Sequence, residues 1–208
     1  MALSYLENMS FTTTRLEGET LEGEIWYGTG FFYNFYGEMY GTKHPRHITI
    51  VTNSHNIEDL QILRFKLPVF KGDRKTTKWE DEDDLELEDI EYIQLSIEEP
   101  ALSELVFYHP DDNIDLCVIK IQAIINASMQ MNKFPFFKAW DHRDILIKKD
   151  KKVFDVVEEI LMIGYPNGLA DNVNNLPIFR KGVTATHPEM NYNGNKEFLI
   201  DIASYKGS

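Results

Sequence analysis

Short runs of β-branched and aromatic residues, separated by Gly, Asn, Asp and Pro, fill the sequence from residue 21 onward. Such runs between turn residues are typical of β-strands, and apolar residues at helical spacing are scarce, so we expect an all-β fold. The Asn-Gly pairs at 167–168 and 193–194 predict turns. The predicted strands cover residues 47–52, 60–67, 93–97, 105–108, 114–121, 160–163, 178–185 and 198–202, and residues 24–36 are predicted to pair as a hairpin around Gly28-Thr29-Gly30.

Composition and charge narrow the class of protein. With 43% hydrophobic and 12% aromatic residues among 208, the chain has enough apolar surface for a buried core. Its 21 basic and 34 acidic residues give a net charge of −13, which repels phosphate backbones and anionic lipids. We therefore expect neither nucleic acid nor a membrane surface as a partner.

The single cysteine and the lack of long apolar runs bear on the compartment. Cys117 cannot form an intrachain disulfide, and it lies in a predicted core strand. No secretory signal pattern opens the sequence, and no apolar run approaches the roughly 18 residues of a membrane span. These features predict a soluble, cytoplasmic protein.

Residues 80–91 are strongly acidic, with nine carboxylates in 12 positions. Like charges at this density repel one another and favour a solvated loop, which is the reading we adopt. A calcium site or a patch for a basic substrate is the alternative, although the glycine and ligand spacing of an EF-hand are missing.

Two residues at predicted strand ends carry the candidate chemistry. His55 follows the strand 47–52 after Asn53-Ser54, and Asp115 opens the strand that contains Cys117. Taken singly, a strand-end histidine is commonly a surface or capping group, and an aspartate before a strand is commonly a turn residue. Side by side, the carboxylate would orient the imidazole, whose other nitrogen would take a proton from a serine.

Five short motifs follow one another along the chain: Gly28-Thr29-Gly30-Phe31-Phe32, ITIVTNSH at 48–55, HPDDNIDL at 109–116, IGYPNG at 163–168, and FLID at 198–201 before Gly207-Ser208. In this order they resemble the trypsin-like serine peptidases of the bacterial, disulfide-free type, and are similar to the protease domain of the high-temperature-requirement family. The resemblance covers roughly residues 21–208 and implies a chymotrypsin-like double β-barrel in which His55 is the general base and Asp115 orients it.

The resemblance also implies a division of the chain. Residues 1–20 are expected to be an N-terminal arm or short helix, and residues 21–123 the first barrel. Residues 124–155, mixed in character, are expected to be a linker with one helical turn. Residues 156–208 then form the first part of the second barrel.

The family's nucleophile lies in Gly-x-Ser-Gly, and the spacing places that serine at residue 209, just beyond Ser208. Asp201 then matches an acidic residue of the nucleophile loop, eight places earlier, and Gly207 supplies an oxyanion-hole amide. If Ser208 were the nucleophile, Lys206 would occupy the position where glycine is needed to turn its N–H toward the substrate. The 208 residues alone are therefore expected to be inactive, with the second barrel incomplete.

Other groups of polar residues give weaker indications of a binding site. Pro45 prevents the helix that would align His44 and His47 on one metal. Asp111 and Asp112, although near Asp115, suit a turn better than a cation site. We expect no metal and no cofactor.

The function expected from this reading is a serine endopeptidase acting on proteins or peptides, with a Ser-His-Asp triad. Ala203, at the family's pocket-floor position, suggests a small or aliphatic preference. Such an enzyme would need restraint by a regulatory partner or an appended sensor domain, which would fit a bacterial defence or stress protease. The alternative is an inert barrel that serves as a protein-binding module.

Overall fold

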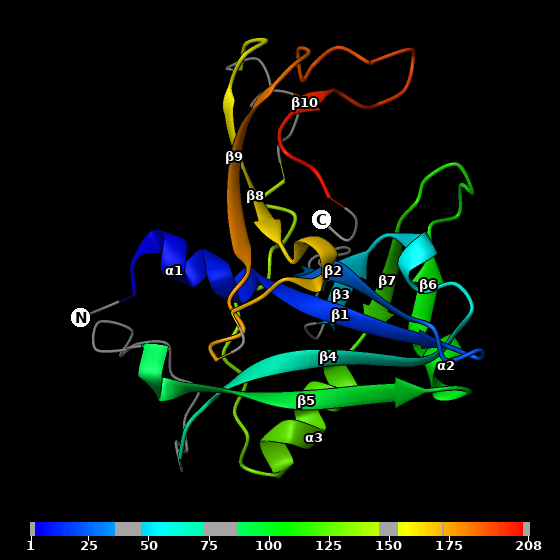
Figure 1. Cartoon of the computed structure of the whole chain (residues 1–208), viewed down its shortest axis with the longest axis vertical. Coiled ribbons are helices and arrows are strands. Elements are labelled where there is room, and N and C mark those ends of the chain that lie inside the picture. Colours follow the sequence, from blue (N-terminus) through cyan, green and yellow to red (C-terminus); the bar gives the residue numbers. More distant parts are fainter. Residues whose placement is uncertain (1–2, 36–46, 73–86, 146–153, 172, 206–208) are drawn as a thin grey trace, which may run out of the picture.

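The computed structural model describes residues 3–35, 47–72, 87–145, 154–171 and 173–205. Its strands form two antiparallel sheets, one seven-stranded in the order β5-β4-β1-β2-β3-β7-β6 and one three-stranded in the order β10-β9-β8 (Figure 1). The strands are β1 Thr13–Thr20, β2 Ile25–Phe35, β3 His47–Thr52, β4 Leu60–Phe70, β5 Ile90–Glu98, β6 Val106–Tyr108, β7 Cys117–Lys120, β8 Glu159–Gly164, β9 Ile178–Thr184 and β10 Ile200–Asp201.

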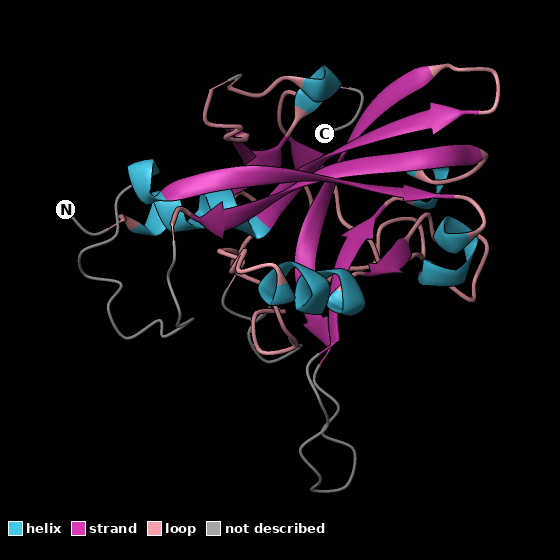
Figure 2. Cartoon of the chain, turned by 90° about the horizontal axis from the view of Figure 1, so that it is seen from below, coloured by secondary structure: helices cyan, strands magenta, loops and turns pink. Residues whose placement is uncertain are grey.

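Short helices lie around the strands (Figure 2). Among the described residues, none has the length and hydrophobicity that crossing a membrane would require. The α-helices are α1 Tyr5–Met9, α2 Ala101–Leu105 and α3 Gln122–Gln130, and the 3-10 turns are η1 Ser10–Thr12, η2 Ser54–Asn56, η4 Leu87–Asp89 and η5 Pro166–Gly168.

The predicted all-β fold class is confirmed, because antiparallel sheets make up most of the regular structure. The barrels, however, are not closed by strand pairing among the described residues. In the larger sheet, β5 and β6 are the two edges, and α2 occupies the connection between them. The strands predicted for the two halves of the chain do fall in separate sheets.

The N-terminal boundary of the larger sheet differs from the prediction. Residues 1–20 were expected to be an arm or short helix, and this holds only for α1 and η1. Strand β1 lies in the middle of the sheet, between β4 and β2. The mostly polar residues of β1 do not give the alternating pattern of a strand. Packing supports the strand instead, since Gly18 leaves room for the ring of Trp26, which an added Cβ would approach to 2.3 Å.

The predicted hairpin at residues 24–36 is also wrong, because β2 runs without a turn from Ile25 to Phe35. Its glycines serve close packing instead of chain reversal. A Cβ on Gly28 would lie 2.9 Å from the side chain of Asn56, and a Cβ on Gly30 would lie 2.4 Å from Ile50.

The segment predicted as a linker, 124–155, packs in part against the larger sheet. It begins within α3, and the segment 134–140 then bonds to two strands. The N–H of Phe136 donates to the carbonyl of Pro68 at 2.8 Å, and that of Trp140 donates to the carbonyl of Phe32 at 2.9 Å. The aromatic residues around Pro135 explain the difference, since Phe136 is buried against Phe11.

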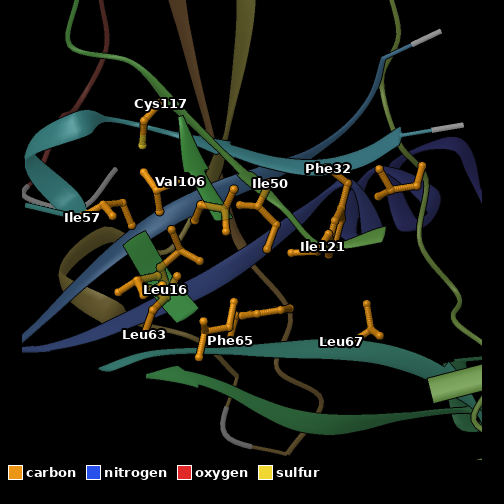
Figure 3. Packing of buried hydrophobic residues seen from close by; sticks show 14 of the residues in the cluster. Leu16, Phe32, Ile50, Ile57, Leu63, Phe65, Leu67, Val106, Cys117 and Ile121 are labelled. Carbon is orange, nitrogen blue, oxygen red and sulfur yellow. The ribbon is translucent and has the colours of Figure 1, made fainter. Parts of the chain in front are cut away.

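The main hydrophobic core lies inside the curved larger sheet (Figure 3). It includes Leu16, Phe32, Ile50 and Leu63, all fully buried. Cys117 is part of this core, as predicted, and burial raises the pKa of its thiol to about 12. Every strand of the larger sheet contributes residues to this core, β5 through Ile97. The strands that carry the candidate site therefore rest on a rigid base.

Candidate active site

The end of β3 places His55 at the surface while fixing its backbone. The hydroxyl of Thr52 donates to the carbonyl of Thr29 at 2.9 Å, and the side-chain amide of Asn56 donates to the Thr52 hydroxyl at 3.1 Å. Asn56 is buried, whereas 65% of the His55 side chain is exposed. The turn η2 is therefore anchored on both sides of an imidazole that faces solvent.

Strand register brings Asp115 beside this turn. Strands β3 and β7 are antiparallel with Thr52 opposite Cys117, so the chain just after β3 lies next to the chain just before β7. In Figure 1, η2 and β7 lie at the same end of the larger sheet. Asp115 lies two residues before Cys117, outside the strand; the strand predicted for 114–121 begins only at Cys117.

The imidazole and the carboxylate meet in a two-point contact. Nδ1 of His55 lies 2.6 Å from Oδ2 of Asp115, and the backbone N–H of His55 donates to Oδ1 at 3.1 Å. Both carboxylate oxygens are thus engaged by one residue. The ring nitrogen Nε2 has no hydrogen-bond partner among the described residues.

The electrostatics of the pair define the tautomer. Partial burial tends to raise the pKa of Asp115, but the hydrogen bonds from the backbone and ring of His55, its charge, and a bond from Asn53 outweigh burial, so the pKa lies below its usual value. An ionised carboxylate can only accept hydrogen bonds. Nδ1 of a neutral His55 therefore carries the hydrogen, and Nε2 carries the free lone pair, ready to accept a proton.

A cleft of about 530 Å³ lies against this pair. Of the pair, Asp115 lines the cleft and His55 does not, although its neighbour Ser54 does. Its remaining lining combines carboxylates with aromatic and aliphatic surface: Glu58, Asp59, Tyr108, His109, Asp112 and Ile114.

The other predicted site residues are placed differently. Asp201 lies on β10 opposite Val183 of β9, and the carbonyl of Ala203 accepts a hydrogen bond from Arg180 at 2.8 Å. Both are exposed, and neither is hydrogen-bonded to His55 or Asp115. Gly207 and Ser208 lie outside the described residues, as does Lys206, so the predicted roles of Asp201, Ala203, Gly207 and Ser208 remain predictions.

Sequence reasoning missed one member of the site, Asn53. Its side-chain amide donates to Oδ2 of Asp115 at 3.1 Å and to the Asp115 backbone carbonyl at 3.0 Å. The signal available in the sequence was its place, directly after a predicted strand and two residues before His55. Its partner could not be named without the β3–β7 register.

The weaker constellations give no metal site in the part of the chain that the structure describes, where no three His, Cys, Asp or Glu side chains gather around one point. Asp111 is a turn residue, as predicted, since its Oδ1 accepts the backbone N–H of Asn113 at 3.0 Å. His44 and most of the acidic segment 80–91 lie outside the described residues. The last five residues of that segment begin with η4 and enter β5.

Comparisons with known proteins give a distant structural likeness. The chain is similar to the solved crystal structure of Deg5, with 16% sequence identity, a TM-score of 0.47, and coverage of 97% of this chain and 73% of that chain. No protein-family model matches the sequence, and no curated protein matches it either.

Proposed function

We propose that this protein is a serine endopeptidase that hydrolyses peptide bonds, with His55 as general base and Asp115 as the residue that orients it. One observation carries the proposal: Nδ1 of His55 lies 2.6 Å from Oδ2 of Asp115, while 65% of the His55 side chain is exposed. A nucleophilic serine needs a base whose far nitrogen is held by a carboxylate and whose near nitrogen is free.

The chemistry follows from the two ring nitrogens. His55 Nε2 takes the proton of a serine hydroxyl as the oxygen attacks a peptide carbonyl, and then gives that proton to the leaving amine. Water attacks the resulting acyl-serine in the same way, with His55 taking its proton and returning it to the serine oxygen as the new carboxylic acid leaves. Asp115 stays ionised throughout and stabilises the imidazolium that forms in between. Its lowered pKa supports this role, because a protonated carboxyl would carry no negative charge to stabilise the imidazolium.

The remaining parts of the machinery are assigned by the sequence resemblance. The proposed nucleophile is a serine at position 209, with the amide of Gly207 in the oxyanion hole and Asp201 and Ser208 in the nucleophile loop. Ala203 would form the floor of the primary pocket and favour small or aliphatic side chains. Substrates would be proteins or peptides, and a regulatory partner or appended sensor domain would restrain the activity.

The cleft beside the pair supports a peptide substrate. At about 530 Å³ it has room for an amino-acid side chain, and it opens directly beside Asp115. A peptide whose reacting carbonyl lay near His55 would place a neighbouring residue in it.

A fluorophosphonate probe on the natural full-length protein tests the proposal. We expect covalent labelling of one serine, found by peptide mass spectrometry at position 209, and loss of at least about 1,000-fold in labelling rate in His55→Ala. His47→Ala is the matched control, since it removes an exposed imidazole from the opposite end of the same strand. Labelling that is absent, or equal in wild type and His55→Ala, would reject the enzyme and favour the inert binding module.

A further inference from the structure

Asn53 occupies the cap position of the turn that carries His55, yet its side chain does not cap that turn. An asparagine at this position usually accepts a backbone N–H two or three residues further on. Here Asn53 has extended backbone angles, φ −70° and ψ 145°, and makes no side-chain cap bond. Its side chain is committed elsewhere.

The capping bond is instead supplied by Asp115. The backbone N–H of His55, two residues after Asn53, donates to Oδ1 of Asp115 at 3.1 Å. The carboxylate therefore caps the turn from another part of the chain, 60 positions away. This arrangement ties the position of Asp115 to the backbone of the histidine it faces.

Asn53 in turn fixes the carboxylate. Its amide donates both to the backbone carbonyl of Asp115, at 3.0 Å, and to Oδ2, at 3.1 Å. Two bonds from one NH2 group, one to the main chain and one to the carboxylate end, restrict both the backbone and the side-chain rotamer of Asp115. Oδ2 is the same oxygen that faces Nδ1 of His55.

The backbone of Asn53 is itself held from the core side. Its carbonyl lies 3.7 Å from Sγ of Cys117, a residue that is 1% exposed. The pairing of Thr52 with Cys117 sets this geometry, since β3 ends and β7 begins at that pair. Asn53 thus links the buried end of the two strands to the exposed pair.

We propose that Asn53 is a positioning residue for the His55–Asp115 pair. It holds the Asp115 carboxylate in the one orientation that keeps the hydrogen of a neutral His55 on Nδ1. This matters because 48% of the Asp115 side chain is exposed, so water competes for its oxygens. The consequence for catalysis rests on the proposed function, but the effect on the imidazole does not.

The tautomer of His55 is the direct readout. In full-length protein carrying ¹⁵N-histidine, the ring nitrogen shifts of the neutral His55 should report hydrogen on Nδ1. In Asn53→Ala, Asp115 gains rotational freedom, and the shifts should move toward the Nε2–H form that free imidazole prefers. A residue with a purely structural role would leave the tautomer unchanged once the protein is folded.

Asn113→Ala is the matched control. The Asn113 amide donates to Oδ1 of Asp111 at 2.9 Å in the loop just before Asp115, so the variant removes the same kind of bond from the same loop without touching the pair. We expect its His55 tautomer to equal that of wild type. Folded Asn53→Ala protein with a wild-type tautomer overturns the proposal.

Two further measurements cover a failure of Asn53→Ala to fold. Asn53→Leu has a similar shape but no donors, and it must also shift the tautomer. In unmodified protein, the two side-chain amide protons of Asn53 should exchange with solvent at least about tenfold more slowly than those of an exposed asparagine such as Asn195. Exchange as fast as at Asn195 contradicts the two hydrogen bonds and overturns the proposal.

Peptide hydrolysis provides the catalytic arm. We expect Asn53→Ala to lower kcat by roughly 10–100-fold, the range typical for residues that orient a functional histidine or carboxylate, with little change in KM. A wild-type protein without hydrolysis would reject the proposed function, while the tautomer would still decide the role of Asn53. An unchanged kcat in an active enzyme would reject the catalytic consequence.

Discussion

The backbone N–H of Tyr165 donates a hydrogen bond of 2.9 Å to Oγ1 of Thr29 and so connects the two sheets across 136 positions of the chain. The carbonyl of Thr29 accepts a hydrogen bond from the hydroxyl of Thr52, the last residue of β3, which leads into the turn of His55. Gly164 allows the approach, because a Cβ there would lie 2.7 Å from Thr29 Oγ1. One residue, Thr29, therefore connects the end of β8 in the smaller sheet to β3, the strand that precedes the candidate base.

Replacing Thr29 by valine should destabilise this junction. Valine keeps the β-branched shape but leaves the N–H of Tyr165, which is 1% exposed, without its acceptor. We expect a loss of about 1–3 kcal/mol in the free energy of unfolding, measured by urea denaturation. Thr20→Val is the control, since Thr20 accepts a similar bond from Glu24 in an exposed turn. Equal effects of the two variants would argue against the junction.

The contact between Gly30 and Ile50 yields a second prediction. A methyl group on Gly30 would lie 2.4 Å from Cγ2 of Ile50, which is fully buried. Gly30→Ala should therefore cost about 1–3 kcal/mol of stability through overpacking. In a double-mutant cycle, Gly30→Ala should be less harmful in an Ile50→Ala background by at least about 0.5 kcal/mol. Additive effects would mean that the added methyl finds room elsewhere.

Gly28 and Gly30 also explain why a hairpin was predicted where β2 runs straight. Gly28-Thr29-Gly30 has the composition of a turn, and nothing in the local sequence reveals that its glycines face Asn56 and Ile50. Strand β1 was missed for the opposite reason, because its polar residues offer no apolar alternation. Both errors arise where packing between distant segments overrides local preference.

The candidate pair was accessible from sequence because each residue sits at the end of a strongly β-branched run. His55 follows HITIVT, and Asp115 precedes CVIK. The register that joins these ends, Thr52 opposite Cys117, is not written in either run. For this reason the role of Asn53, which depends on that register alone, emerged only from the structure.

The ion pair of Asp141 and Arg143 predicts a pH-dependent stability. The bond from the Arg143 side chain, stronger than the opposing effect of burial, lowers the pKa of Asp141 from 3.8 to about 2. A carboxyl with a lowered folded-state pKa stabilises the protein above its unfolded pKa, and that contribution is lost as the pH falls through the folded value.

Asp141→Asn should therefore lose about 1–2 kcal/mol at pH 7, a figure reduced for screening because Arg143 is 71% exposed. The difference from wild type should shrink as the pH falls from 4 to 2. Urea denaturation at pH 7, 4 and 2.5 measures it, with Asp155→Asn, a variant at an exposed carboxylate without an ion pair among the described residues, as control. A difference that stays constant with pH would contradict the ionic origin.

Asp115→Asn tests the orienting role directly. An amide in place of the carboxylate can donate to Nδ1 of His55 and so force the hydrogen onto Nε2, the nitrogen that must accept the serine proton. We expect fluorophosphonate labelling of the full-length protein to slow by roughly 10³–10⁴-fold while the fold is kept. Asp112→Asn neutralises a neighbouring carboxylate of the cleft that does not contact His55. It should change the labelling rate by less than about tenfold, because solvent and salt screen the effect of a charge that is not in contact. Similar rates in both variants would mean that Asp115 contributes only negative charge to the cleft, and the proposed triad would fail.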